Sequence, residues 1–360
     1  MGIGLPSCYN SIIEKKTFPL SGFVKPSVDA VRAGRWRNMK KERKRWETCF
    51  MPICRDCPRR CGVERSVTLQ TKGKNGACSM PFSPVVARAA LHFGEEPCIS
   101  GSRGSGTIFF SGCSLHCVFC QNYGISTENL GQEISVPRLR EIYRELIAQG
   151  AHNINLVNPT HFVRAIAQSL DQPLSVPVVY NCGGYESVDS LRLLEGKVQI
   201  YLPDLKYADN RLAMRYSNAA DYFERASTAI REMVRQTGPY RLGPDGMLLS
   251  GVLIRHLILP GQVSNSKRVI DWVADTFPAK TVLFSLMSQY LPCGKASDFP
   301  EINRRLYQRE YDEVEEYLFQ KGIEDGFLQE LSSANCAYIP DFDMTGVLLP
   351  ETRTGSLDKT

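Results

Sequence analysis

The sequence predicts an α/β fold built around a parallel sheet, and three observations support this class. Beyond residue 100, short apolar or β-branched runs alternate with amphipathic segments, which is the pattern of βα units. The 360 residues contain 43% hydrophobic and 22% charged side chains, as ordinary globular proteins do. Polar motifs directly follow the apolar runs, and barrel sites lie at the carboxyl ends of their strands. We therefore expect the functional site at that edge of the sheet.

Six predicted strands carry this pattern, together with five predicted helices. The strands are apolar runs of five to eight residues: Thr107–Ser111, Asn153–Val157, Val176–Tyr180, Val198–Leu202, Val252–Leu259 and Lys280–Met287. The helices are amphipathic: Arg138–Gln149, His161–Leu170, Ser187–Leu194, Asp221–Gln236 and Ser266–Thr276. Strands that alternate with helices at this spacing favour parallel pairing.

Three cysteines follow the first predicted strand at Cys-x3-Cys-x2-Cys spacing: Cys113, Cys117 and Cys120. Thiols this close on one loop can all turn toward one point, and thiolates favour iron–sulfur clusters and zinc. A four-iron cluster normally takes four cysteines, and no fourth lies in this loop, so one iron would stay open to another ligand. A zinc site or scattered core thiols are the alternatives.

This loop resembles the signature of the radical S-adenosylmethionine (SAM) superfamily, and the preceding Gly112 and the aromatic Phe119 fit its usual form. Further segments are similar to one subfamily, the uncharacterised proteins related to pyruvate formate-lyase activating enzyme: residues 94–101, 104–112, 153–157, 200–207, 252–261 and 287–290. The match runs from about Cys54 to Tyr311. The resemblance implies a partial (β/α)6 TIM-like barrel of the radical SAM type, with a cysteine-rich N-terminal extension.

The resemblance also implies an activity. A 4Fe-4S cluster on the three cysteines would reductively cleave SAM, giving a 5′-deoxyadenosyl radical that abstracts hydrogen from a substrate. The substrate could be a glycyl radical enzyme to be activated, another peptide or a small molecule. A low-potential electron donor, flavodoxin or ferredoxin, is the implied partner. The alternative is a non-catalytic metal-binding module that contacts nucleic acid or a protein through its basic, cysteine-rich N-terminus, although such a module has no need for polar groups at the strand ends.

Polar residues after the second and third strands are candidates for binding SAM. Asn158 and Thr160 occupy the region in which the superfamily usually contacts the amino group of SAM. Thr160 could equally cap the following helix. Asn181 offers a hydrogen-bond donor and an acceptor, and Gly183 permits close backbone approach, although a plain tight turn explains that stretch as well.

The fourth and fifth strands end in charged residues. Asp204 and Lys206 are two residues apart and therefore point the same way on an extended strand. They could bind SAM or substrate, or form a structural ion pair. Arg255 and His256 point to opposite faces, and we expect Arg255 to face inward and His256 to be a buried interface residue. With Phe119, the cofactor-binding candidates are therefore Asn158, Thr160, Asn181, Gly183, Asp204, Lys206 and Arg255.

A second cysteine group lies upstream at Cys54, Cys57, Cys61 and Cys78. Four thiols within 25 residues, interspersed with glycines and a proline, predict a small metal-binding knuckle. Iron–sulfur fits if the knuckle relays electrons or binds substrate, and zinc fits if it is structural. Cys182 is not needed for either group and is expected to be a small core residue.

The charge of the chain is concentrated near its start. Residues 1–60 hold 14 Lys and Arg against 5 Asp and Glu, a net charge of +9, whereas the whole chain carries +5. We expect an amphipathic helix over Trp36–Cys49; nucleic acid or acidic lipid is the less favoured partner of this segment.

No apolar run suits a membrane span, no secretory signal is evident, and grouped cysteines suit a reducing cytoplasm. The expected divisions are a basic extension (1–50), the knuckle and lead-in (51–100), the partial barrel (101–300) and a C-terminal helical segment and tail (301–360).

Overall fold

The structure is a computed structural model, and it describes residues 53–70, 75–333 and 340–348. The chain divides into two units, residues 1–50 and 51–360. The first unit, with the predicted helix Trp36–Cys49, lies outside the described residues. Everything below concerns the second unit.

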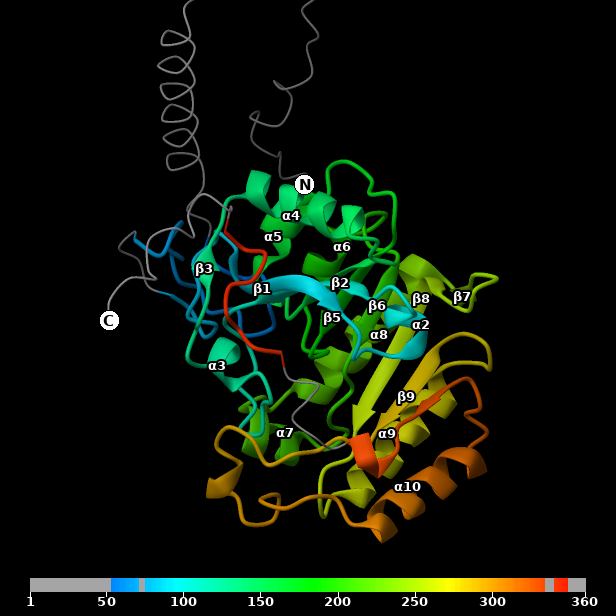
Figure 1. Cartoon of the computed structure of the whole chain (residues 1–360). Coiled ribbons are helices and arrows are strands. Elements are labelled where there is room, and N and C mark those ends of the chain that lie inside the picture. Colours follow the sequence, from blue (N-terminus) through cyan, green and yellow to red (C-terminus); the bar gives the residue numbers. More distant parts are fainter. Residues whose placement is uncertain (1–52, 71–74, 334–339, 349–360) are drawn as a thin grey trace, which may run out of the picture. The chain divides into compact units, whose positions relative to one another are not determined.

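The sheet contains the six predicted strands as parallel neighbours (Figure 1). They are β2 (Ser105–Phe110), β4 (Ile154–Val157), β5 (Val178–Cys182), β6 (Ile200–Pro203), β8 (Leu248–Leu257) and β9 (Leu283–Met287). Each pairs in parallel with the next in chain order. The predicted α/β class and the largely parallel sheet are therefore confirmed.

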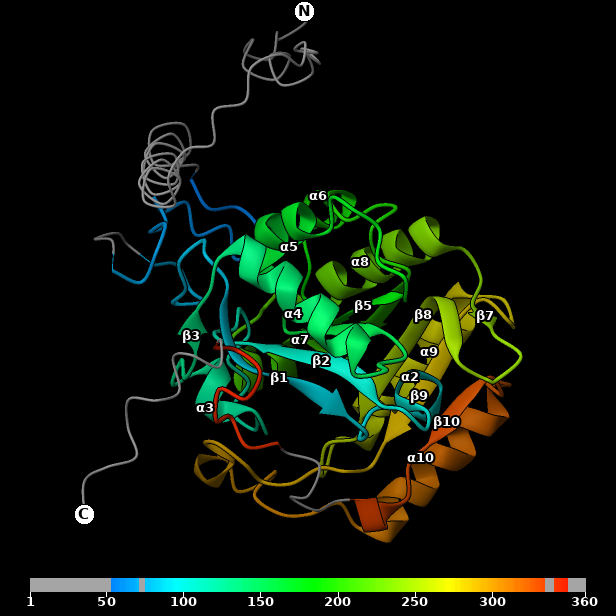
Figure 2. The same ribbon diagram turned by 45° about the horizontal axis from the view of Figure 1, so that its top comes forward.

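Helices follow the parallel strands and pack side by side (Figure 2). The longer ones are α4 (Val136–Ala148), α5 (Val163–Ser169), α7 (Asn210–Ser217), α8 (Tyr222–Thr237), α9 (Val263–Thr276) and α10 (Gln308–Gln320). The short ones are α2 (Pro97–Ser100), α3 (Tyr123–Ser126), α6 (Val188–Arg192) and the 3₁₀ turns η2 (Thr160–Phe162), η3 (Ala296–Asp298) and η4 (Leu331–Ser333). In α8 the buried side chains recur at helical spacing, from Tyr222 through Ala226 and Ile230 to Met233. No described helix has the length and apolar character that crossing a membrane requires.

The sequence pattern did not predict four further strands of the described residues. They are β1 (Val85–His92), β3 (Gln132–Glu133) and β7 (Arg241–Leu242), which pair antiparallel, and β10 (Gly326–Leu328), which pairs in parallel with β9. Strands β1 and β3 extend the sheet at one side, β10 extends it at the other, and β7 pairs with β8 off this order. The strand β1 lies against β2 across almost the whole length of both. The segment expected to lead into the parallel sheet therefore contributes a full strand to it.

One face of the parallel sheet is filled by a small apolar cluster. Val179, Ile200, Leu202 and Leu253 from neighbouring strands pack there against α2, whose buried residues include Ile99. Because α2 follows β1 directly, the loop between them is held against this face. That loop contains Glu95 and Glu96, and it borders the cavity described next.

Candidate functional site

A cavity of about 530 Å3 lies at the carboxyl ends of the parallel strands. Each of the six predicted strands contributes to its lining, either from the strand end or from the loop that follows. The loop between β1 and α2 and the strand β10 complete the wall. The cavity therefore lies at the edge of the sheet where the sequence placed its polar motifs.

The three cysteines of the loop after β2 all line this cavity. The Cys117 sulfur accepts a hydrogen bond of 2.9 Å from the hydroxyl of Ser217. The Cys120 sulfur accepts one of 3.3 Å from the Ser126 hydroxyl, and the Cys113 sulfur accepts one of 3.3 Å from the backbone N–H of Leu115. Donors already point at all three sulfurs, which favours their thiolate forms.

Burial and mutual repulsion keep these thiols protonated in the absence of a bound metal. Burial raises the pKa of Cys113 to about 11, and the neighbouring Cys117 adds to the effect. Burial also raises the pKa of Cys117 and of Cys120, with further contributions from Cys120 and Cys113 respectively. Each thiol is thus close enough to another for the negative charge of one to raise the pKa of the other. An all-sulfur set of three that meets in one cavity, with no fourth thiol in the loop, fits a four-iron cluster with one open position.

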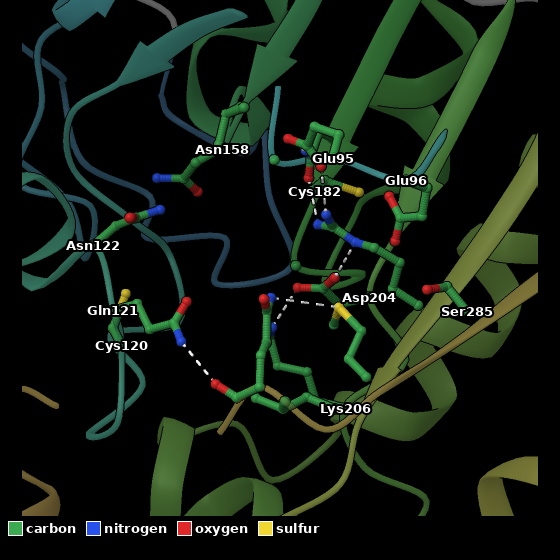
Figure 3. A pocket seen from close by; sticks show the side chains of 18 of the residues that line it. Glu95, Glu96, Cys120, Gln121, Asn122, Asn158, Cys182, Asp204, Lys206 and Ser285 are labelled. Carbon is green, nitrogen blue, oxygen red and sulfur yellow. Dashed lines mark hydrogen bonds and ion pairs between the residues drawn. The ribbon is translucent and has the colours of Figure 1, made fainter. Parts of the chain in front are cut away.

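Charged side chains form another wall of the cavity (Figure 3). Asp204 accepts a hydrogen bond of 2.9 Å from Nε of Arg255 and a second from Nζ of Lys206. Burial opposes ionisation of Asp204, but the charges of Arg255 and Lys206 outweigh it and keep the pKa of the carboxyl below its ordinary value. The predicted pair is therefore an ion pair inside the cavity, and Arg255 faces inward as expected.

Glu95 completes this charged network. Its Oε2 accepts from Nη1 of Arg255 at 3.0 Å, and its Oε1 accepts from the side-chain amides of Asn155 and Asn181 at 3.0 and 3.1 Å. Nη2 of Arg255 donates to Oδ1 of Asn181 at 2.6 Å. Asn181 therefore lines the cavity with both ends of its amide already bound to the network.

The other predicted residues lie around the cysteine loop. Phe119 is buried and packs against Tyr216 and Tyr290. Asn158 lines the cavity, and its side-chain amide donates to the carbonyl of Gly112, next to Cys113. Gly183 lines the cavity too, and a side chain there would meet Leu115 of the cysteine loop at 2.8 Å. These contacts position the loop, and a role in binding SAM remains a prediction.

Thr160 is not the helix cap, and it lies outside the lining of the cavity. The short helix η2 begins at Thr160, and Pro159 takes the capping position. Thr160 is buried, and its hydroxyl donates to a carboxylate oxygen of Glu186. Burial raises the pKa of Glu186 to about 7 despite this bond and a second one from Tyr180. Thr160 therefore stabilises a buried carboxyl group, and a role in binding SAM remains a prediction.

His256 is a buried interface residue, as expected. Its Nδ1 lies 2.7 Å from the carbonyl of Leu205 and its Nε2 lies 2.8 Å from the hydroxyl of Ser266. Burial lowers its pKa to about 4. The imidazole therefore joins β8 to the loop after β6 and to α9 as a neutral group.

The four knuckle thiols lie close to one another but outside the cavity lining. Burial raises the pKa of Cys57 to about 12, and Cys78, Cys54 and Cys61 each add to that shift. The backbone N–H of Ala77 donates to the Cys61 sulfur at 3.2 Å. The amides of Arg59 and Met80 hydrogen-bond to Cys57 and Cys78. Backbone donors aimed at several sulfurs stabilise thiolates, the form that binds metals.

Two arginines of the knuckle attach it to the rest of the domain. Arg59 donates to the carbonyls of Ser114 and Ser217 at 2.8 and 3.0 Å, so it braces the cysteine loop. Arg65 is completely buried and donates to the carbonyls of Met80 and His161, each at 2.6 Å. Its guanidinium also lies over the ring of Phe162.

The backbone approaches closely where the two cysteine groups meet. Gly112 has a φ of +76°, which only glycine adopts freely. A Cβ atom there would lie 2.6 Å from the carbonyl oxygen of Cys78. The glycine that precedes Cys113 thus lets the knuckle pack directly against the cysteine loop.

No group of three or more His, Cys, Asp or Glu side chains is arranged to hold a single metal ion within residues 53–70, 75–333 and 340–348. Metal at either cysteine group remains a prediction.

Sequence reasoning did not identify Glu95 and Glu96 as site residues. Both line the cavity, although they precede the first parallel strand. Two adjacent acids followed by Pro97 were a usable signal, because charged residues next to a buried strand need partners. Their place in the cavity depends on β1, which the pattern did not predict.

The cysteine loop at the carboxyl end of the first parallel strand thus faces a charged cavity. No family model matches the chain. Over 275 residues the chain is 30% identical to the uncharacterized protein MJ0674 of Methanocaldococcus jannaschii. The aligned region covers 74% of this chain and 73% of that protein. The chain belongs to the same family as that protein.

Solved structures with partial similarity include a spore photoproduct lyase mutant, with 12% identity, a TM-score of 0.44 and coverage of 68% of this chain and 80% of that one. Streptococcus suis SuiB bound to precursor peptide SuiA is similar over 62% of this chain, with 12% identity and a TM-score of 0.42. The chain spans about half, 48%, of the length of SuiB. TM-scores of this size do not establish a common fold.

Proposed function

We propose that this protein is a radical SAM enzyme, with a 4Fe-4S cluster held by Cys113, Cys117 and Cys120. The observation that carries the proposal is the convergence of three thiols in one cavity with Asp204, Lys206 and Arg255. The order of the six parallel strands suits the partial (β/α)6 barrel that the family resemblance implies.

When bound, the cluster supplies the electron that cleaves SAM into methionine and a 5′-deoxyadenosyl radical, which abstracts hydrogen from the substrate. The chain's own residues position the reactants. Phe119, Asn158 and Gly183 hold the cysteine loop in place. Lys206 and Asp204 supply opposite charges within the cavity, where the carboxylate and amino groups of SAM can find partners. The apolar side chains of Leu115 and Phe109 help to keep water from the reacting atoms.

Further parts of the proposal concern partners and the knuckle. A low-potential donor such as flavodoxin or ferredoxin would reduce the cluster. The knuckle would hold a metal, either a second iron–sulfur cluster or zinc. The seven cysteines of the two groups are not joined by disulfides, and grouped cysteines suit a reducing compartment such as the cytoplasm. Activation of a glycyl radical enzyme is one candidate role. Nothing in the cavity favours the non-catalytic binding module, and the basic stretch that suggested it lies outside the described residues.

Electron paramagnetic resonance tests the proposal. Anaerobically purified and reduced wild-type protein should show a cluster signal that changes on adding SAM, and should release methionine and 5′-deoxyadenosine. A variant with Cys113→Ala, Cys117→Ala and Cys120→Ala should lose the SAM-sensitive signal and the cleavage. Cys182→Ala, which removes a thiol of the same cavity outside the motif, is the matched control and should keep both. A wild-type signal that SAM leaves unaltered would refute the proposal.

A further inference from the structure

One acid in the cavity wall, Glu96, has a carboxylate oxygen without a partner in the described structure. Oε2 of Glu96 is buried and makes no hydrogen bond in the described structure. Buried polar atoms are nearly always paired, and leaving one unpaired costs about 1–3 kcal/mol. The loop between β1 and α2 holds Glu96 in the lining of the cavity.

The charges around Glu96 do not balance it. Arg255 is engaged by Glu95 and Asp204, at 3.0 and 2.9 Å. Lys206 is engaged by Asp204. These two acids and two bases neutralise one another, so Glu96 is the third acid of the lining and has no cation of its own.

Burial makes the charged form of Glu96 costly in the empty cavity. It raises the pKa of the carboxyl group, and the charge of Arg255 only partly offsets this effect. Of the other titratable lining residues, His92 has its pKa lowered by burial and by Arg88, so it supplies no positive charge at neutral pH. No unengaged cation of the described lining faces Glu96, so a cationic ligand would supply the charge that favours its carboxylate form.

The surroundings of Glu96 are suited to an organic cation. Glu96 and Ser285 lie on one side of the view in Figure 3, whereas Cys120 and Asn122 lie on the other. Phe109, Phe327 and Leu328 also line the cavity. A volume of about 530 Å3 is in the range of small-molecule sites. A ligand could thus place an ammonium group at Glu96 and an apolar part toward the reactive loop.

We propose that Glu96 is the specificity-determining residue of this site, and that it binds the protonated primary amine of the substrate. This inference rests on the proposed function, because the cavity is the one in which SAM would be cleaved. Glu95 is the positioning residue of the pair: with all its acceptor contacts inside the network, it fixes the loop and leaves Glu96 for the ligand. The substrate class is therefore an amine with an apolar portion, carried by a small molecule or by a peptide.

Phenethylamine and its neutral counterpart 2-phenylethanol are suitable probes. Calorimetry on anaerobic, cluster-loaded protein with SAM should show that phenethylamine binds at least about tenfold more tightly, because a buried acceptor discriminates strongly against ligands that cannot satisfy it. In Glu96→Gln this preference should disappear. Glu324→Gln, which alters an exposed acid outside the cavity, is the matched control and should retain it.

The measurements separate this proposal from the one on which it rests. Because Oε2 of Glu96 has no partner, Glu96→Gln removes no hydrogen bond of that atom, and it should fold and load its cluster; Glu324→Gln, outside the cavity, is the variant that should cleave SAM as the wild type does. If the preference for the amine persists in Glu96→Gln, is missing in the wild type, or is lost together with SAM affinity, the amine site is wrong. If the wild type shows the preference but never cleaves SAM, the amine site stands and the radical SAM assignment fails.

Discussion

The two cysteine groups of this protein are similar in sequence but differ in their surroundings. Both place several cysteines within one short segment, and both have hydrogen-bond donors aimed at their sulfurs. All three thiols of the loop after β2 line the cavity, whereas none of the four knuckle thiols does. The difference teaches that spacing identifies a metal-binding segment, while access to a cavity decides whether chemistry can take place there.

The largest expected effect concerns the knuckle. Structural metal binding is folding free energy, so Cys57→Ala should lower the melting temperature by about 10 °C or more. The variant should keep the SAM-sensitive resonance signal of the other cysteine group. Elemental analysis of the Cys113, Cys117 and Cys120 triple variant should find roughly four irons or about one zinc per chain.

Cys98→Ala is the control for the knuckle, since it removes a buried thiol of α2 outside both groups. It should lose no metal and little stability. A folded triple variant that contains no metal would show that the four knuckle thiols do not form a metal site. The knuckle would then be an ordinary packed segment.

A smaller effect is expected where charge faces the cavity. Lys206→Ala or Asp204→Ala should reduce SAM cleavage at least about tenfold, or about 1.4 kcal/mol of transition-state stabilisation, with cluster iron intact. The reason is that Asp204→Ala leaves Lys206 without its carboxylate partner, whereas Lys206→Ala removes one of the two cations that hold Asp204, the other being Arg255. Radiolabelled SAM cleavage assays, with iron determined on the same samples, provide the measurement.

Asp209 and Arg211 offer a matched pair at the same spacing outside the cavity, joined at 2.9 Å. Arg211→Ala should leave cleavage unchanged. If the Lys206→Ala variant loses iron and activity in parallel, the Asp204–Lys206 ion pair stabilises the fold instead of acting on the reactants. The two ion pairs, inside and outside the cavity, would then not differ in function.

The smallest effect concerns His161, which lies between the two cysteine groups. Its Nε2 donates to the carbonyl of Ser111 at 2.7 Å, and its Nδ1 is buried without a partner. Burial lowers its pKa to about 3. Because this is below the ordinary value of 6.5, His161 contributes stability that is complete above pH 6.5 and is lost as the pH falls toward 3. Between pH 7 and 5.5 the loss should be about 1 kcal/mol.

His161→Gln should reduce the dependence of the free energy of unfolding on pH, because glutamine can still donate to the carbonyl of Ser111 but does not titrate. Urea denaturation of both proteins at pH 7 and 5.5 measures the difference. SAM cleavage at pH 7 should be unaffected, since His161 does not line the cavity. If the free energy of unfolding depends on pH identically in both proteins, protonation of His161 does not contribute to that dependence.

Much of the fold was predictable because buried parallel strands leave a strong sequence pattern. All five residues of β5 are buried, so its apolar run could be recognised without knowledge of its neighbours. The strand β1 was not predicted, since an arginine and several alanines weaken its pattern and only pairing with β2 makes it a strand. Contacts between residues distant in sequence are not visible in local periodicity.

The site was predictable to the extent that strand ends define it. Asp204, Lys206, Arg255 and Asn181 meet in the cavity because parallel strands end at one edge. Glu96 could not be found this way, because it precedes the sheet. Arg65 was unexpected too: a charged residue among cysteines is normally exposed, whereas here backbone carbonyls satisfy its guanidinium.

The anchoring of Arg65 also has a consequence for biosynthesis. One of its acceptors, the carbonyl of His161, lies 96 residues further along the chain. At a translation rate of about 5–20 residues per second, that stretch takes roughly 5–20 s to emerge from the ribosome. For that interval the knuckle of the nascent polypeptide lacks its final support, and its thiols are open to oxidants. Aerobic expression should therefore damage this segment before the rest of the protein exists, which makes the oxygen supply during growth as important as that during purification.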